Sequence, residues 1–420
     1  MKVLVIGGGG REHAIVRALK KNGRVSRIYA APGNGGIGRD AALAQIKAVD
    51  IKAMTEFAVG NAVDYVVVAP DDPLAIGMVD ALEAKGVRCF GPNKAAARIE
   101  SSKIFAKNLM RKYNIPTASY ETFRDPYKAK DYLNSDNVSF PIVIKADGLA
   151  LGKGVIIAAD INEAREAVNS IMMEKKFGES GGSIVIEEFL TGPEVSVLAF
   201  TDGKTVTPMV SSMDHKRAFD GNNGPNTGGM GVIAPNPHYT GEIAALCEKT
   251  IFTPTIRATR EEGCLFKGCL YFGLMLTPRG PMVIEYNCRF GDPETQAILA
   301  LLETDLLDIM EAVTDERLES VNIRWKEERA ACVVIASGGY PETYKTGFAI
   351  SGIEEAERQG AVVYHAGTEY RDGVFLTAGG RVLGVTSAAP SLDTALEKAY
   401  GAVRAISFEG ARYRRDIGKY

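Results

Sequence analysis

Residues 140–157 read FPIVIKADGLALGKGVII, and this stretch decides how the rest of the chain is interpreted. The β-branched run 141–146 predicts a strand with Lys145 near its end, and residues 155–158 predict a second strand. The loop between these strands contains Gly148, Gly152, Lys153 and Gly154. A Walker loop joins a strand to a helix and has Ser or Thr after its lysine, so this hairpin is a different structure. We expect a flap whose backbone N–H groups close over phosphate oxygens, with a glycine-rich turn and solvated lysines as the alternative.

The composition indicates a large globular chain without a polyanion-binding surface. With 420 residues, 46% of them hydrophobic, the chain is too long for one core, so two to four domains are expected. Lys and Arg number 49 against 52 Asp and Glu, which argues against nucleic-acid and membrane partners. No apolar run reaches the length of a signal peptide core or a membrane span. Six cysteines without CxxC spacing and four histidines argue against zinc and disulfides, so a reducing cytoplasm is expected.

The first hundred residues predict a doubly wound α/β domain. A strand at 2–6, a glycine turn at 7–10 and a helix at 12–21 open it. A dinucleotide fingerprint would need a third glycine where Glu12 stands and an acid after the second strand, which ends in Ala-Pro instead. A nicotinamide oxidoreductase is therefore a disfavoured alternative, although the glycine turn can still bind a phosphate at the helix N-terminus.

The turns after the predicted strands of this domain are candidates for a binding cleft. Further strands are expected at 64–69 and 88–90. Ligands of an open parallel sheet bind outside the carboxyl ends of its strands. The predicted cleft is therefore lined by residues 8–11, by residues 32–34 and by Asp71. Ordinary βα turns with helix caps are the alternative for each loop taken singly.

The middle of the chain contains two weaker signals for a nucleotide. A helix at 103–113, capped by Ser101 or Ser102, places Lys103 at the positive end of the helix dipole, which indicates an anion nearby. After an amphipathic helix at 162–176, strands at 183–187 and 194–201 flank a short apolar linker. Its backbone groups can meet an adenine edge, with Glu194 in reach of ribose hydroxyls, whereas a plain core linker is the alternative.

Residues 211–231, SSMDHKRAFDGNNGPNTGGMG, lack hydrophobic periodicity. A polar loop of this length inside a compact domain is usually functional or disordered. Asp214 and Lys216 favour a substrate loop. His215 is expected to position its neighbours or to face solvent rather than to bind a metal, because no second histidine lies nearby.

Residues 282–294, MVIEYNCRFGDPE, form the second informative stretch. In a strand, Glu285, Asn287 and Arg289 lie on one face. A carboxylate beside an amide oxygen suits Mg²⁺, and Arg289 then neutralises an anionic substrate group, with a Glu–Arg ion pair as the alternative. The following Asp292 is expected to cap a helix that runs through Leu307.

The last hundred residues predict a polar linker and a small α+β domain. The linker is expected at 314–328. Strands at 330–337, 361–365 and 381–387 precede a helix at 392–406, and no catalytic constellation is evident among them.

Together, these stretches resemble the ATP-grasp superfamily, and the whole chain resembles the phosphoribosylamine–glycine ligase family within it. The strings that carry this resemblance are GGGGREHA, FPIVIKADGLALGKGV, DHKR, GPNTGGMG, YNCRFGDPETQ, SGGYP and YRRDIG. The resemblance implies an N-terminal substrate domain at 1–100 and an ATP-grasp body at 101–313 with a mobile lid at about 120–190. The linker at 314–328 and the C-terminal domain at 329–420 follow.

The family resemblance also implies ligands and residue roles. The implied ligands are ATP, Mg²⁺ or Mn²⁺, glycine and 5-phosphoribosylamine. ATP contacts are implied for Lys103, Lys145, Gly148, Gly152, Lys153, Gly154, Glu187, Glu188, Leu190 and Glu194. Metal contacts fall on Glu285 and Asn287, and catalytic roles on Lys145 and Arg289. Substrate contacts are implied for Asp214, Lys216, Arg289 and the cleft residues Gly8, Gly9, Arg11, Glu12, Asn34 and Asp71.

Two departures from the family pattern affect these roles. The strand 271–276 carries no additional acidic metal ligand, and Asp71 stands where a glutamate is expected. The implied reaction forms glycyl phosphate from glycine and ATP, after which the amine of 5-phosphoribosylamine attacks it. The alternatives are an ATP-grasp ligase or carboxylase acting on another purine intermediate, and a catalytically silent nucleotide-binding module. We expect a monomer, with a weak dimer as the alternative.

Overall fold

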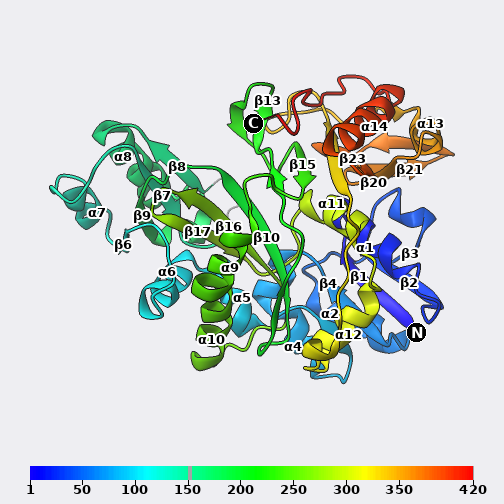
Figure 1. Ribbon diagram of the computed structural model, residues 1–420, viewed down its shortest axis with the longest axis horizontal. Helices are drawn as coiled ribbons and strands as arrows, with labels where there is room; N and C mark the ends of the chain where they lie inside the picture. The colour runs from blue at the N-terminus through cyan, green and yellow to red at the C-terminus, as the bar shows by residue number, and fades with distance from the viewer. Residues whose placement is uncertain (150–153, 420) are drawn as a thin grey trace.

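The computed structural model describes residues 1–149 and 154–419, so the predicted sites Gly152 and Lys153 lie outside the described residues. Figure 1 shows three groups of elements around a central sheet. The blue N-terminal elements lie at the lower right, the cyan segment that carries the glycine-rich hairpin lies at the left, and the orange and red C-terminal elements lie at the upper right.

The N-terminal region is the predicted doubly wound domain. Its five parallel strands have the order β3-β2-β1-β4-β5. The strands are β1 (Lys2–Gly7), β2 (Arg27–Pro32), β3 (Ala42–Leu43), β4 (Tyr65–Val68) and β5 (Arg88–Phe90). The helices are α1 (Gly10–Leu19), α2 (Ile51–Gly60), α3 (Asp71–Ile76), α4 (Met78–Glu83) and α5 (Lys94–Ser101). Helix α1 begins two residues earlier than expected, because the Glu12 carboxylate accepts the Gly9 N–H at 2.6 Å and closes the first turn.

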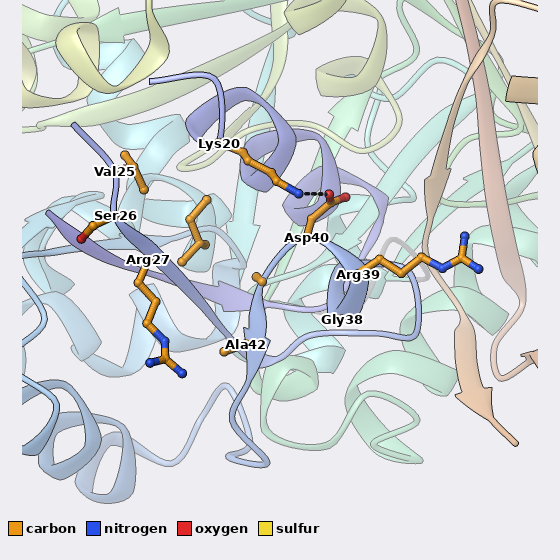
Figure 2. A pocket seen from close by; sticks show the side chains of 10 residues that line it. Lys20, Val25, Ser26, Arg27, Gly38, Arg39, Asp40 and Ala42 are labelled. Atoms are coloured by element: carbon orange, nitrogen blue, oxygen red, sulfur yellow. Dashed lines mark hydrogen bonds and ion pairs between the residues drawn. The ribbon is translucent and has the colours of Figure 1, made fainter. Parts of the chain in front are cut away.

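A pocket of about 410 Å³ lies on the surface of this domain, beside α1 and β2 (Figure 2). Lys20 is ion-paired with Asp40 there at 2.7 Å, while Arg27 and Arg39 extend away from that pair. Arg27 stacks on Tyr29 and Arg39 on Phe375. The charged side chains of this pocket are thus engaged, and it is separate from the predicted cleft at the strand ends.

The cyan segment forms a four-stranded antiparallel sheet, here called the lid sheet, with the order β6-β9-β7-β8. Its strands are β6 (Tyr120–Phe123), β7 (Ile142–Ala146), β8 (Val155–Ala158) and β9 (Ile184–Glu188), covered by α7 (Pro126–Tyr132) and α8 (Ile161–Val168). The predicted hairpin is confirmed, since β7 and β8 pair directly. The expected helix 162–176 is shorter, because α8 changes to a π-helical turn at Asn169–Met173.

The central antiparallel sheet, here called the body sheet, has the order β11-β10-β16-β17. Its strands are β10 (Glu194–Thr201), β11 (Val206–Pro208), β16 (Gly268–Thr277) and β17 (Gly280–Asn287). The helices beside it are α6 (Lys103–Lys112), α9 (Gly241–Cys247) and α10 (Thr253–Glu261). Helix α6 starts where expected, because the Ser102 hydroxyl accepts the Phe105 N–H at 3.1 Å.

The expected irregular loop 211–231 contains strands, which corrects the sequence interpretation. They are β12 (Met213–Asp214), β13 (Arg217–Phe219) and β14 (Asn223–Asn226), followed by β15 (Gly231–Ala234). Strands β12 and β15 join the C-terminal sheet through β18. The buried Arg414 donates to the Arg217 carbonyl at 3.1 Å. These partners lie far away in sequence, so local periodicity does not reveal the strands.

The C-terminal region completes the sheet β12-β15-β18-β23-β20. Its own strands there are β18 (Arg329–Ala336), β20 (Val362–His365) and β23 (Arg381–Ala389), packed against α14 (Leu392–Ala405) and α13 (Ile353–Arg358). A small second sheet contains β19 (Ala349–Ile350), β21 (Thr368–Arg371) and β22 (Val374–Thr377). The predicted α+β character is confirmed, although two strands of the main sheet come from residues 213–234.

The helix expected from Asp292 through Leu307 is two helices, α11 (Glu294–Leu301) and α12 (Leu306–Thr314). The Asp305 carboxylate caps α12 by accepting the Leu307 N–H at 2.8 Å. Asp292 does not cap α11, since the N-cap position is Pro293 and no side chain bonds there. Asp292 instead accepts hydrogen bonds from the Gln296 amide at 2.8 Å and from the Arg11 N–H of the N-terminal domain at 3.5 Å.

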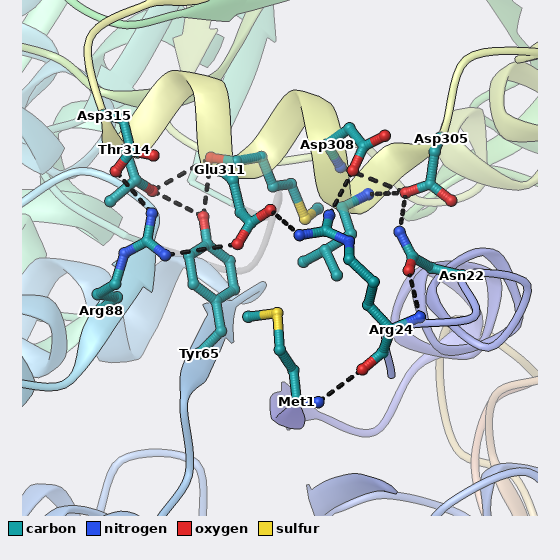
Figure 3. Close-up of polar contacts among 12 residues, drawn as sticks. Met1, Asn22, Arg24, Tyr65, Arg88, Asp305, Asp308, Glu311, Thr314 and Asp315 are labelled. Carbon is teal, nitrogen blue, oxygen red and sulfur yellow. Dashed lines mark hydrogen bonds and ion pairs between the residues drawn. The ribbon is translucent and has the colours of Figure 1, made fainter. Parts of the chain in front are cut away.

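Helix α12 is attached to the N-terminal domain by the polar network in Figure 3, here called the α12 seam. Arg24 pairs with Asp308 and with Glu311, and Arg88 pairs with Glu311 and Asp315. The buried Tyr65 hydroxyl donates to the Met310 carbonyl at 2.8 Å. The seam joins residues more than 200 positions apart in the chain.

Candidate active site

The predicted phosphate ligands lie where the lid sheet meets α6. Lys145, the fourth residue of β7, is buried and donates to the Ile284 carbonyl at 3.1 Å. Lys103 donates to the Gly148 carbonyl at 2.8 Å, and burial lowers the Lys103 pKa. The anion expected at the α6 N-terminus is the Asp147 carboxylate, which accepts the Ile104 N–H at 3.1 Å. A protein carboxylate therefore accounts locally for the signal that suggested a phosphate.

Glu187 lies between two lysines rather than free in the cleft. One of its oxygens is ion-paired with Lys145 and the other with Lys107. Burial opposes ionisation of Glu187, but the charges of Lys145 and Lys107 outweigh it and lower the Glu187 pKa. The group holds two positive charges and one negative charge in a site with almost no solvent exposure.

The predicted adenine contacts follow β9. The Glu188 N–H is already bonded to the Ser119 carbonyl at 3.0 Å, and its carboxylate pairs with Arg279 at 2.7 Å. The Leu190 N–H makes no hydrogen bond within residues 1–149 and 154–419. Leu190 itself is buried beside the exposed Phe189. The unengaged N–H of Leu190 is thus suited to a purine edge, whereas the Glu188 side chain points to a surface ion pair.

The predicted metal ligands, Glu285 and Asn287, lie near the end of β17. The described residues make no hydrogen bond or ion pair to the Glu285 carboxylate, while Asn287 Oδ1 accepts from Arg289 at 3.1 Å. Burial opposes ionisation of Glu285, but nearby lysines outweigh it and lower its pKa. Gly273 lies opposite Glu285 in the register, so the neighbouring strand supplies no acid. Two protein oxygens with an ionised carboxylate fit a cation that takes its other ligands from phosphate and water.

Arg289 lies just beyond β17 and is held by Glu100. The guanidinium pairs with the Glu100 carboxylate at 3.0 Å, which replaces the alternative of a pair with Glu285. Glu100 also accepts the Cys288 N–H at 2.6 Å. Arg289 Nε is buried without a partner in the described structure, so the arginine retains a donor for an anionic group.

Asp214 and Lys216 lie near the same group of residues, since the charge of Lys216 acts on the Glu285 carboxylate. Lys216 pairs with Glu194 at 2.9 Å, and the charge of Glu194 raises the Lys216 pKa. Asp214 Oδ1 is buried without a hydrogen-bond partner in the described structure. Burial and then the charge of Glu294 raise the Asp214 pKa. His215 is buried and accepts the Gly418 N–H at 3.0 Å, so it positions the chain and does not face solvent.

The N-terminal cleft residues gather at the carboxyl ends of β1 and β2. Glu12 is buried, and it holds the glycine turn through Gly9 N–H and pairs with Arg11 at 2.7 Å. Arg11 also donates to the Phe290 carbonyl at 3.0 Å, which places this turn next to the Arg289 segment. Gly8 approaches Gly33 so closely that a Cβ would lie 2.4 Å from the Gly33 oxygen. The turn therefore requires glycine there.

Asn34 and Asp71 occupy different parts of the same edge. The Asn34 amide donates to the Gly8 carbonyl at 2.9 Å and to the His365 carbonyl at 2.8 Å, so it ties the glycine turn to the C-terminal region. Asp71 forms no hydrogen bond or ion pair in the described part of the chain. Its charge acts on Arg289 and Glu100, which places it beside that pair.

Several residues of this site were not predicted from the sequence. They are Glu100, Lys107, Asp147, Asp292 and Arg381. Arg381 of β23 donates to the Gly228 carbonyl at 2.6 Å and the Asp292 carbonyl at 2.7 Å, so the C-terminal region reaches the cleft. Lys107 follows Lys103 by one helical turn, which is a signal for a shared face. The others gave no local signal, because their partners come from distant segments.

The fold and the family models together define the class of protein. A model of the phosphoribosylglycinamide synthetase ATP-grasp domain matches residues 101–295, and models of the N and C domains of the same family match residues 1–100 and 330–420. The chain is thus an ATP-grasp ligase, a class that uses ATP with a divalent metal. More particularly, it belongs to the phosphoribosylglycinamide synthetase family.

Similar proteins agree with this assignment. The phosphoribosylamine–glycine ligase of Caldanaerobacter subterraneus subsp. tengcongensis is 49% identical over 99% of both chains. The crystal structure of the Thermotoga maritima phosphoribosylamine–glycine ligase superposes with a TM-score of 0.88 at 33% identity and covers 99% of this chain and 100% of that one. A biotin carboxylase from Campylobacter jejuni has a TM-score of 0.75 at 15% identity, covers 98% of this chain and 92% of its own, and shares the fold alone. Among the described residues, no helix is long and apolar enough to cross a bilayer.

Proposed function

We propose that this chain joins glycine to 5-phosphoribosylamine, with cleavage of ATP to ADP and phosphate, through a glycyl phosphate intermediate. The observation that carries the proposal is the position of Arg289. It lies beside Asn287 on one side, and its neighbour Phe290 holds Arg11 of the N-terminal glycine turn on the other. An activated carboxylate next to Arg289 would thus lie between the nucleotide and the acceptor amine.

The charges of the cleft suit this chemistry. Lys103 and Lys145 would bind ATP phosphates, and the flap around Gly148 and Gly154 would cover them and exclude water from the acyl phosphate. Glu285 and Asn287 would hold Mg²⁺ or Mn²⁺, which when bound neutralises phosphate charge. Arg289 Nε would donate to the glycine carboxylate.

The acceptor site is proposed at the N-terminal strand ends. Backbone N–H groups of the turn around Gly8, Gly9 and Arg11 would bind the phosphate of 5-phosphoribosylamine at the N-terminus of α1. Glu12 and Asn34 would hold this turn in shape, and Asp71 would face the ribose. Asp214, with its unpartnered oxygen, and Lys216 would contact glycine.

The test is ADP release with MgATP and glycine, with and without freshly generated 5-phosphoribosylamine. We expect ADP to form only when both glycine and 5-phosphoribosylamine are present, in an amount equal to the glycinamide ribonucleotide formed. ADP formation that depends on another acceptor would assign the same ATP-grasp site to a different purine intermediate. Binding of ATP without ADP formation from any acceptor would indicate a silent nucleotide-binding module.

A further inference from the structure

We propose that Lys107 is a positioning residue of the ATP site, which shares the charge of Glu187 and so leaves Lys145 positive toward the nucleotide phosphates. The inference rests on the ATP site proposed above. It concerns a lysine that is one turn away from Lys103 and buried behind the cleft, where it would act through Glu187 rather than touch the nucleotide.

The position of Lys107 is defined by contacts with β9 and with the segment between α6 and β6. Its ammonium is ion-paired with Glu187 of β9 and donates to Thr117 Oγ1 at 2.8 Å. The Thr117 hydroxyl in turn donates to the Val283 carbonyl of β17 at 2.7 Å. Only 4% of the Lys107 side chain is exposed, so solvent contributes little to holding its charge. The ammonium is thus fixed against Glu187 by the body sheet.

The charge count explains why a second lysine is needed. Glu187 presents one oxygen to Lys107 and the other to Lys145. If Lys145 and Glu187 were alone, they would form a neutral pair, and a phosphate would gain little from approaching it. With Lys107 the three side chains carry a net charge of plus one, and Lys145 stands on β7, the strand that leads toward Gly148. In a site of low dielectric constant, that difference is large.

The same arrangement predicts a pH dependence. Burial lowers the Lys107 pKa to about 8, against the opposing charge of Glu187. The other groups around it are Lys145 from β7 and the Tyr120 ring from β6, 5.5 Å away, while the charge of Glu188 acts on it from the other face of β9. As the pH rises through about 8, Lys107 loses its proton and the three side chains become neutral overall. ATP affinity is then expected to fall.

The experiment measures ATP dissociation constants by titration calorimetry of the full chain with saturating Mg²⁺, without glycine or acceptor. The variants are Lys107→Met and Lys107→Arg. The matched control is Lys112→Met on the same helix, since Lys112 also pairs with a glutamate, Glu262, but is 64% exposed. Each protein is compared with Lys107→Arg at the same pH, so that a change in the ionisation of ATP itself affects both dissociation constants equally.

We expect Lys107→Met to weaken ATP binding about tenfold at neutral pH, as one neighbouring charge shifts an ionic equilibrium by about that factor. Lys107→Arg and Lys112→Met should bind ATP as the unmodified chain does. Above the Lys107 pKa of about 8, the unmodified chain should approach Lys107→Met, while Lys107→Arg keeps its affinity.

Two results would overturn the proposal. One is Lys107→Met with unchanged ATP affinity at neutral pH, even if its melting temperature falls. The other is a loss of ATP affinity at alkaline pH that is as large in Lys107→Arg as in the unmodified chain. This second comparison does not need Lys107→Met, so it tests the proposal even if that variant does not fold. An unmodified chain that binds no ATP at any pH would instead overturn the proposed ATP site itself.

Discussion

Two ionic clusters of this protein lie in opposite surroundings. In the cleft, Glu187 binds Lys107 and Lys145, and the side chains are 2%, 4% and 6% exposed. In the α12 seam of Figure 3, Arg24 and Arg88 bind helix α12 with side chains 49% and 41% exposed. The first cluster has a net charge of plus one and is buried, whereas the second joins two arginines to three carboxylates, a net charge of minus one, mostly at the surface.

The comparison separates exposed ion pairs, which attach one domain to another, from a buried charged cluster, which suits the binding of a ligand. Exposed ion pairs contribute about 0 to 1 kcal/mol, because water and salt screen them. Buried charges cost several kcal/mol of desolvation, which their mutual attraction only partly offsets. A buried cluster with net positive charge is therefore weak as a stabilising device. Its presence is consistent with a ligand that supplies the missing negative charge.

The largest effect is expected from removing the charge at the centre of the buried cluster. Glu187→Gln leaves Lys107 and Lys145 without a carboxylate, and we expect a loss of about 3–5 kcal/mol in the free energy of unfolding. Urea denaturation measures it. Because the folded pKa of Glu187 is below its ordinary 4.5, its contribution is present above that pH and is lost as the pH falls through the folded value. A loss below about 1 kcal/mol would mean that this cluster behaves like an exposed one.

The next effect concerns the half-buried carboxylate of Glu285, which is proposed to hold the metal. Glu285→Gln should lower turnover about 100-fold at ordinary Mg²⁺ concentration and move the Mg²⁺ titration to higher concentration. Unlike Glu187, Glu285 has no protein cation in direct contact, so the melting temperature should hold or rise. The control is Glu261→Gln, which removes an exposed carboxylate paired with Arg257. An unaltered Mg²⁺ titration would remove Glu285 from the metal site.

Arg381 is an intermediate case, with 22% of its side chain exposed. It joins the Gly228 and Asp292 carbonyls, and Asp292 lies under the Gly9–Arg11 turn. We expect Arg381→Met to raise the KM for 5-phosphoribosylamine about tenfold, as loss of a charged hydrogen bond does, with the KM for ATP little changed. Steady-state kinetics with each substrate varied separately will show whether both KM values rise together, which would contradict this role.

The smallest effect is expected in the α12 seam. Arg88→Met removes pairs with Glu311 and Asp315 and should lower the free energy of unfolding by about 1 kcal/mol or less. Raising the salt concentration should reduce the difference between variant and unmodified chain. A loss near that of Glu187→Gln would break the distinction between exposed and buried clusters.

Many side chains that the structure brings together could be predicted, because they stand in short informative strings. The two-residue period of a strand placed Glu285 and Asn287 on one face, with Arg289 just beyond the end of β17, and Lys145 stands one residue before the end of β7. Lys107 and Glu100 were missed, since a lysine or glutamate within a helix is usually solvated. Their roles depend on Glu187 and Arg289, which lie 80 and 189 positions away in the chain.

Most of the elements of this protein, and the charged side chains proposed as its ligands, follow from the sequence alone. Periodicity set the parallel sheet, the lid hairpin and the last helix, because buried faces repeat every two or 3.6 residues. Tertiary structure decided the rest. It drew β12 and β15 into the C-terminal sheet, placed Asp147 at the α6 N-terminus and gave Glu187 two lysines. These pairings join segments that lie far apart in the sequence. Such segments come close only when the hydrophobic cores pack, so local sequence patterns do not reveal them.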